Sequence, residues 1–369
     1  MFTLSRLKTK VLLIESCFMD LMNLLDKTVK RNGQVVIDTK DIFGRLAADT
    51  ISKAILGFHG NSITDGNSNA LSMAQNIHED FSSFSGTMKM MIFIPFWPTL
   101  FKIFGFKIFR NSIHDFFEKH VKDEITKRES EKNTDYGDMI QQIINSKQNK
   151  SCIDFNDEEL VAAQFFVMLG AGWDTASDLM QKCSWELAMN QGVQSDLIRE
   201  IDEVSMALDG ESITYEVLKG LKFLDMVVLE TLRKWSAVHV TMRHCTKDTT
   251  MNFDGDKSIQ FKRGDTIYIP IRMIHHDPQF FENPLEFNPH RFSQENKHKI
   301  NPAVFIPFGG GPRLCIGMKM LVIKVKLLFF NILRKYKIEA CQQTPLIMKF
   351  GLSFLPDEEV FVALKSREN

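Results

Sequence analysis

The stretch that decides the fold is Phe308-Gly-Gly-Gly-Pro-Arg-Leu-Cys-Ile-Gly317. Its glycines lack a Cβ, so the backbone can approach a flat ligand closely here. Cys315 stands just ahead of a predicted helix, 316–336, whose backbone N–H groups and positive end favour a thiolate over a thiol. A thiolate is an electron-rich ligand for iron, and the guanidinium of Arg313 offers a fork of donors to a carboxylate. The alternative interpretation is a glycine-rich turn that carries a buried, inert cysteine.

The bulk composition excludes several classes of protein. The chain has 369 residues, of which 44% are hydrophobic, and a formal net charge of −1. That charge balance gives no sign of nucleic-acid binding. The six cysteines are scattered and none forms a C-x-x-C pair, which argues against zinc sites, thioredoxin-type motifs and a disulfide framework. We therefore expect mostly free thiols in a reducing compartment.

Outward from the Cys315 loop, the patterns predict a mainly α protein with a small β region. Neither an internal repeat nor a low-complexity linker interrupts the chain, so a single domain over residues 1–369 is preferred. The expected elements are two helices within 1–58 separated by 31–33, the second over about Asp38–Leu56, helices at 200–207 and 221–235, a β-hairpin with a further strand within 251–271, and short strands after residue 344.

The longest predicted helix follows a charged region. Leu160 to Trp173 is almost wholly apolar, and Asn156 with Glu159 fits a capping box at its start. An apolar helix too short for a bilayer is typical of a central, buried helix, here continuing to about Met189.

Within that helix, Ala171-Gly-Trp-Asp-Thr175 places an acid and a hydroxyl where apolar side chains are expected. Thr175 can donate a hydrogen bond to the carbonyl of Ala171, four residues earlier, and open the helix locally. The alternative is a simple kink with an exposed Asp174.

The segment Met88 to Phe109 is rich in phenylalanine and is interrupted by prolines and a glycine, so it cannot be one straight helix. Two interpretations stay open. One is a kinked connection packed on the core, and the other is a surface that dips into a bilayer interface.

The spacing F-x-x-G-x-R-x-C-x-G resembles the haem-binding signature of the cytochrome P-450 family at Phe308, Gly311, Arg313, Cys315 and Gly317. In the segment Phe223-Leu-Asp-Met-Val-Val-Leu-Glu-Thr-Leu-Arg233 the chain is similar to the animal microsomal enzymes of that family that metabolise drugs and insecticides, especially insect members. The resemblance implies the cytochrome P-450 fold, haem b as cofactor, Cys315 as the iron ligand and Arg313 as a propionate contact. It also implies insertion of one oxygen atom into a lipophilic small molecule.

The resemblance assigns further residues around the haem. Asp174 and Thr175 match the acid and hydroxyl that deliver protons to dioxygen, although Ala176 departs from the family pattern. Arg243 matches a second propionate contact. The residues that match the family's substrate pocket are Phe165, Phe166, Leu169, Ala171, Val238, His239 and Leu352.

Glu230 and Arg233 lie three residues apart on a predicted helix, a spacing that permits an ion pair. In the family, an E-x-x-R pair of this kind is completed by a second arginine, here Arg291, ahead of Phe292. The resemblance implies that the three residues lock the chain beneath the haem loop.

The resemblance also implies partners and a location. Electrons would come from NADPH through a cytochrome reductase, steered to the basic face after Cys315. The location would be the cytoplasmic face of the endoplasmic reticulum membrane, with peripheral contact through residues 91–109. The basic residues in question are Lys319, Lys324, Lys326, Arg334, Lys335 and Lys337.

Microsomal family members begin with a membrane anchor, early helices, a first sheet and a helix that holds a haem propionate. The first residues of this chain match the family pattern just after that helix, so we expect an N-terminally incomplete cytochrome P-450 domain. Two alternative functions stay open: a haem-thiolate isomerase acting on peroxides, and a non-catalytic remnant that no longer binds haem. Asp174 and Thr175 speak against the isomerase, because that chemistry needs no proton relay.

Overall fold

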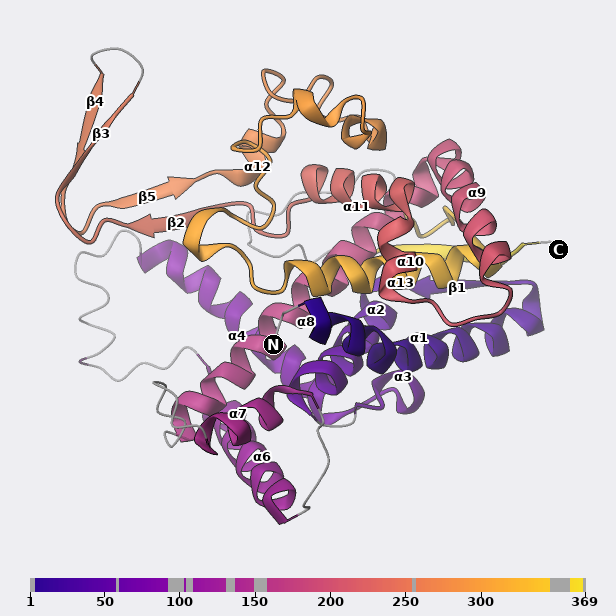
Figure 1. The fold of residues 1–369 in the computed structure, drawn as a ribbon, viewed down its shortest axis with the longest axis horizontal. Helices are drawn as coiled ribbons and strands as arrows, with labels where there is room; N and C mark the ends of the chain where they lie inside the picture. The colour runs from indigo at the N-terminus through magenta and orange to yellow at the C-terminus, as the bar shows by residue number, and fades with distance from the viewer. Residues whose placement is uncertain are drawn as a thin grey trace.

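Helices dominate the computed structural model, which describes residues 4–57, 60–91, 103, 109–130, 137–148, 158–253, 257–345 and 359–367 (Figure 1). The mainly helical fold class expected from the sequence is confirmed. The longer helices are α1 (Leu4–Asn32), α2 (Thr39–Ile51), α4 (Asn69–Met91), α6 (Asn111–Ser130), α7 (Met139–Gln148), α8 (Glu158–Met189), α9 (Gln191–Leu208), α11 (Lys222–Lys234) and α13 (Met318–Lys335). The short ones are η1 (Ser52–Leu56), α3 (Ser62–Asp65), α10 (Tyr215–Gly220), α12 (Ile271–His275), η2 (Pro289–Phe292), η3 (Lys297–Lys299) and η4 (Gly311–Arg313).

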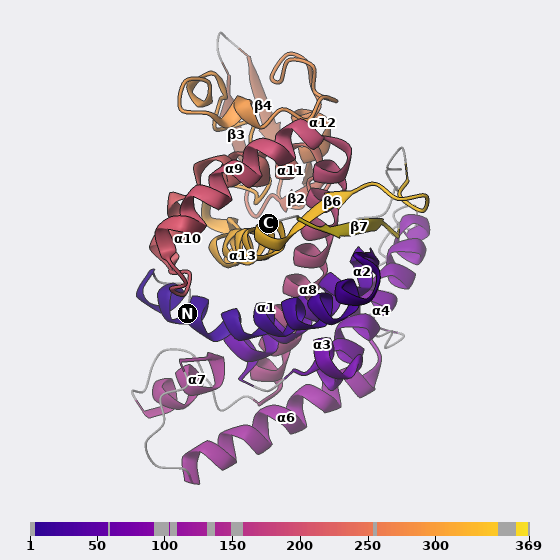
Figure 2. The same ribbon diagram turned by 90° about the vertical axis from the view of Figure 1, so that its right-hand side faces the viewer.

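Helix α8 runs through the middle of the molecule, with α2, α4, α6, α11 and α13 packed around it (Figures 1 and 2). Its extent to Met189 confirms the sequence prediction, while Asn156 of the expected capping box lies outside the described residues. The expectation that this apolar helix is buried all round is wrong. Val167 is 49% exposed because it lines a cavity instead of the core, and Leu160 near the start of the helix is 44% exposed.

Three small antiparallel sheets accompany the helices. The first pairs β1 (Gln34–Asp38) with β7 (Phe361–Ser366), and β7 with β6 (Tyr336–Glu339). Strand β1 was missed from the sequence, since it is a five-residue strand whose partner lies at the other end of the chain. The helix predicted after it is confirmed: the Asp38 side chain caps α2 by accepting from the N–H groups of Lys40 and Asp41.

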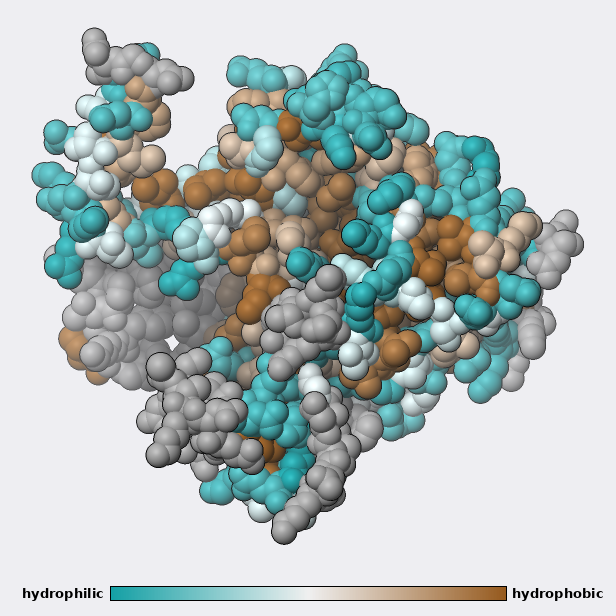
Figure 3. Space-filling model, in the orientation of Figure 1, coloured by the Kyte–Doolittle hydropathy of each residue, from teal (hydrophilic) through white to brown (hydrophobic). Residues whose placement is uncertain are grey.

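The predicted β-hairpin and further strand are present. Strand β3 (Thr249–Asn252) pairs with β4 (Ser258–Phe261), and β5 (Thr266–Ile269) pairs with β2 (Thr241–His244). The hairpin extends away from the helical body, and apolar residues gather in the middle of the same face, beside β2 and β5 (Figures 1 and 3).

The membrane prediction for Met88 to Phe109 falls largely outside the described residues. Among the helices that the structure describes, none is long and apolar enough to span a membrane.

Candidate active site

Cys315 lies in the turn between η4 and α13. Its backbone N–H donates to the carbonyl of Phe308 over 3.0 Å, which closes the loop. Gly309 and Gly311 adopt φ values of +75° and +69°, where any side chain with a Cβ would be strained. The Cys315 thiol is exposed, so the alternative of a buried, inert cysteine is wrong. The loop therefore presents its sulfur outward from a backbone that is fixed on both sides.

Two cavities meet along the exposed stripe of α8. Val167, Ala171 and Thr175 are spaced four residues apart, and they line both cavities. One cavity, of about 130 Å³, also contains Cys315 and Ile316 from the loop. The other, of about 450 Å³, is mainly apolar and reaches α4 and β2. The stripe thus separates the exposed thiol from a compartment large enough for a small apolar molecule.

Asp174 and Thr175 lie at this boundary. The Thr175 hydroxyl donates to the Ala171 carbonyl over 2.7 Å, as the sequence predicted. The predicted local opening of the helix is wrong, because the backbone stays α-helical through these residues. Asp174 is only 18% exposed, and its Oδ1 lies 3.3 Å from Nδ1 of His78 on α4. The alternative of a simple kink with an exposed Asp174 is therefore wrong. An acid and a hydroxyl stand together at the wall of the apolar cavity.

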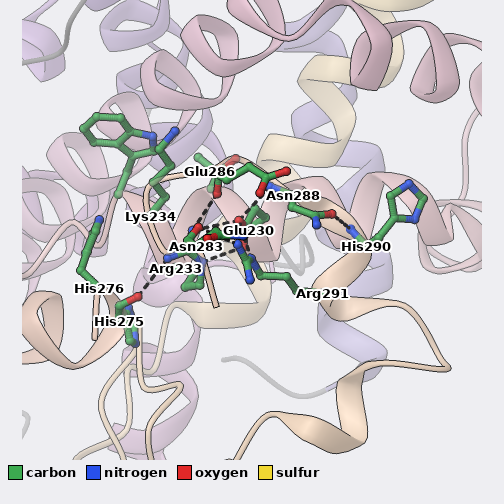
Figure 4. A network of polar contacts seen from close by, with 12 residues as sticks. Glu230, Arg233, Lys234, His275, His276, Asn283, Glu286, Asn288, His290 and Arg291 are labelled. Carbon is green, nitrogen blue, oxygen red and sulfur yellow. Dashed lines mark hydrogen bonds and ion pairs between the residues drawn. The ribbon is translucent and has the colours of Figure 1, made fainter. Parts of the chain in front are cut away.

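A buried polar network ties the segment before the loop to α11 (Figure 4). Glu230 and Arg233 are both fully buried, and their side chains form two hydrogen bonds of 2.8 and 2.9 Å. The Arg233 guanidinium also donates to the carbonyls of His275 and Glu286. Nε of Arg291 lies 3.3 Å from Glu230. The structure thus brings together the three residues that the sequence grouped.

Comparison with known proteins identifies the lineage. The family profile described as "Cytochrome P450" matches residues 2–362. The chain belongs to the cytochrome P450 family. "Probable cytochrome P450 9f2" of Drosophila melanogaster is 32% identical over 377 residues, covering 99% of this chain and 72% of that protein. "Cytochrome P450 9b2" of the same species is 34% identical over 347 residues, covering 93% and 68%. "Cytochrome P450 3A18" of Rattus norvegicus is 32% identical over 338 residues, covering 90% and 66%.

Membership places the chain among the haem-thiolate monooxygenases, and the cavity walls fit a haem. Ile316 follows Cys315, is 61% exposed and lines the smaller cavity, whereas Leu314 on the other side of Cys315 lines a separate groove. The exposed stripe of α8 faces Cys315 and Ile316 across the smaller cavity. Contiguous exposed apolar surface is typical of a binding site. A cytochrome P450 would hold its haem between these two surfaces, with Cys315 toward the iron.

The two arginines predicted to contact the propionates occupy different surroundings. Arg313 is exposed at the end of η4. Arg243 is half-buried on β2, where its Nη1 donates to the Met242 carbonyl at 2.8 Å and to the Thr241 hydroxyl at 3.2 Å. Since Thr241 and Met242 line the larger cavity, Arg243 lies beside that cavity's wall.

Some of the predicted substrate-pocket residues line the larger cavity in the structure, and others do not. Phe166, Ala171 and Val238 line the larger cavity. Phe165 and Leu169 do not, because their positions on α8 turn them into the hydrophobic core, where both are fully buried. His239 is half-buried and is absent from that lining, and Leu352 lies outside the described residues.

The sequence analysis did not predict that α4 contributes to the lining of the larger cavity. Ala74, Ile77, His78 and Phe81 follow helical spacing and line the larger cavity opposite α8. In the sequence these four residues form one face of an amphipathic helix and belong to no catalytic or binding motif. Their spacing could therefore predict that they share a helix face, but not that this face lines the site.

The expectation of one basic face after Cys315 is wrong. Lys324 and Lys326 are 2% and 3% exposed, because the middle of α13 is surrounded by other helices. Lys326 is bound to Asp225 over 2.7 Å, and burial lowers the pKa of Lys324 to about 7. Of the predicted residues, Lys319 is exposed near the loop, and it lies ~22 Å along the helix axis from Arg334. Lys335 and Lys337 are exposed at that far end.

Proposed function

We propose that this cytochrome P450 inserts one atom of dioxygen into a lipophilic small molecule, with electrons from NADPH delivered by a reductase. The supporting observation is the shared wall of the two cavities. Val167, Ala171 and Thr175 border both the compartment that contains Cys315 and the larger apolar compartment. A substrate in the larger cavity would therefore lie directly against the haem compartment.

Each group in the site has a role in this proposal. Bound haem would supply the iron at which dioxygen is activated. Cys315 would hold the iron, while Arg313 and Arg243 would hold the propionates. Asp174 and Thr175 would move protons at the cavity boundary, the hydroxyl being held by its bond to the Ala171 carbonyl. The apolar lining would bind a lipophilic substrate and exclude water, and few polar groups lie there to fix its orientation.

Glu230, Arg233 and Arg291 take a structural role in the proposal. The Glu230 carboxylate accepts from the Asn288 N–H as well as from the two arginines, which joins α11 to the segment before the Cys315 loop. Such a network would keep the loop in place while the haem is bound.

The partner and location are proposed on the same basis. A reductase would approach the face around a groove of about 390 Å³ that includes Lys219, Lys319 and Phe308. Lys219 and Lys319 are exposed there, so they would attract an acidic partner in place of the buried lysines of α13. From the family resemblance we also propose a location at the cytoplasmic face of the endoplasmic reticulum membrane, with peripheral contact through residues 91–109.

The experiment that tests the proposal is haem reconstitution followed by spectroscopy. The protein is expressed with haem, reduced and exposed to carbon monoxide. We expect the absorption band of a thiolate-ligated ferrous–CO haem, which Cys315→Ala should abolish. Cys245→Ala and Cys341→Ala are matched controls, since both thiols are partly exposed and distant in sequence from the loop. Folded protein that shows no such band would refute the proposal.

A second assay separates the monooxygenase from the peroxide isomerase. The reconstituted protein is given apolar substrates with NADPH and reductase, or a lipid hydroperoxide with neither. Oxygenated product that requires NADPH and reductase supports the monooxygenase. Rearrangement of the hydroperoxide without them would support the isomerase instead.

A further inference from the structure

Helix α8 carries ionisable side chains at every fourth position beyond the cavity. Asp174, Asp178, Lys182 and Glu186 fall on one face, because residues four apart are neighbours on a helix surface. Asp174 lies at the cavity wall, and the next two are buried, with 8% of Asp178 and 2% of Lys182 exposed. A line of ionisable groups thus leads from the cavity into the interior.

The far end of this line is fully satisfied. Glu186 accepts from Nε1 of Trp235 over 2.6 Å and from Nζ of Lys234 over 2.8 Å. It also accepts from the Asn190 side chain. A buried carboxylate held by this many donors is a structural anchor.

The middle of the line differs. Asp178 Oδ1 and Lys182 Nζ lie 3.6 Å apart, too far for a hydrogen bond. Within the described part of the chain, neither atom has a hydrogen-bond partner. The two groups are left with their mutual attraction and, for Lys182, the ring of Trp235 at 5.9 Å from Nζ to the centroid. Buried polar atoms without a hydrogen bond are rare in proteins and costly to fold. Such a cost in the middle of a well-packed helix suggests that the pair has a functional reason.

We propose that Asp178 is a buried proton store that re-protonates Asp174 during turnover, with Lys182 acting as its positioning partner. This inference rests on the proposed function, which makes Asp174 the acid at the cavity boundary. The O–H bond of Asp178 breaks and a new O–H bond forms on the Asp174 carboxylate, directly or across one water. A hydronium ion from solvent then returns the proton to the Asp178 carboxylate and leaves as water, since 8% of the Asp178 side chain is accessible.

The charges around Asp178 suit this role. Burial raises the pKa of the Asp178 carboxyl to about 6. Lys182 of α8 and Lys40 of α2 lower that pKa, and Asp174 raises it. On its other side Asp174 faces His78 of α4. An acid that titrates near neutrality can take up a proton and give it away, whereas one at its ordinary pKa stays ionised.

Infrared spectroscopy tests the store without haem. In a pH titration of the folded protein, we expect the carbonyl stretch of a protonated carboxylic acid to disappear with a midpoint near pH 6. Asp178→Asn should remove this band, and Cys315→Ala should retain it. Lys182→Met should shift the midpoint upward, because it removes a cation that favours the ionised form. Asp196→Asn is the control, because the Asp196 side chain is 45% exposed, and it should leave the band unchanged. Burial also raises the pKa of the Glu186 carboxyl, so the decisive comparison is the difference between the wild-type and Asp178→Asn spectra. A titrating band that is unchanged in Asp178→Asn would overturn the inference.

Turnover provides the second readout. With NADPH and reductase, the ratio of product formed to NADPH consumed should fall in the wild-type protein as pH rises through about 6. That dependence should be lost in Asp178→Asn and regained in Asp178→Glu. An active Asp178→Asn protein with an unchanged pH profile would overturn the role of Asp178 alone. Absence of product in the wild-type protein would overturn the proposed function and, with it, this role in turnover.

Discussion

Replacing Arg233 by methionine should destabilise the fold strongly. Arg233 and Glu230 are fully buried, and the guanidinium makes two bonds to Glu230 and two to backbone carbonyls. The change leaves Glu230 buried with Arg291 at 3.3 Å as its nearest remaining cation. Loss of one partner of a buried ion pair costs about 3–5 kcal/mol. That is a large share of the ~5–15 kcal/mol by which a folded protein is stable.

Urea denaturation followed by circular dichroism measures this free energy of unfolding. Arg199→Met is the matched control, because Arg199 pairs with Asp196 at the same i, i+3 spacing on the surface, with side chains 70% and 45% exposed. The control should leave the urea midpoint unchanged. In a double-mutant cycle, Arg233→Met with Glu230→Leu should cost less than the sum of the single changes by about 1 kcal/mol or more. A loss below ~1 kcal/mol in Arg233→Met would refute the reasoning.

Three further perturbations test other parts of the structure. Trp173→Phe removes the hydrogen bond of 2.8 Å from Nε1 to the Gly44 carbonyl. It should lower the free energy of unfolding by ~1 kcal/mol in the same urea assay. No change in that free energy would contradict the contribution of this bond to stability. Burial lowers the pKa of His275 to about 4, so the unfolded state binds its proton first and stability should fall as pH drops from ~6.5 to ~4. His275→Gln keeps an acceptor for the Ile306 N–H and should flatten this dependence of stability on pH, measured as the urea midpoint against pH. An unaltered pH dependence would contradict the assignment of the effect to His275. Gly57→Ala should lower the melting temperature, because φ is +76° and a Cβ would lie 2.5 Å from the Asp138 carboxylate; an unchanged melting temperature would contradict the steric argument.

The sequence predicted the site best where chemistry is concentrated in short motifs. The Cys315 loop, the Thr175 hydroxyl bond and the Glu230–Arg233 pair depend on neighbours within a few residues, so local spacing was sufficient. The long apolar helix was also predicted to its last residue, because its apolar run is long and no proline interrupts it.

Features that depend on packing between distant elements were predicted less well. The direction in which α8 presents Phe165 and Phe166 depends on where α4 and α6 pack, and periodicity alone does not fix it. The burial of Lys324 and Lys326 likewise follows from the helices around α13, whereas their charge suggested a surface. Asp178 carried no motif, and its place behind Asp174 became meaningful only once the cavity was located.

The pairing of β1 with β7 has a consequence for biosynthesis. The Thr39 side chain and the Val360 carbonyl that meet next to these strands are 321 residues apart in the chain. Closing so long a loop carries an entropic cost that only the finished sheet and the packing around it can offset. This sheet therefore cannot form until β7 has left the ribosome. Until then the backbone N–H and C=O groups of β1 have no partner strand. During that interval the nascent chain exposes a template for wrong strand pairing, which is where a chaperone would be needed most.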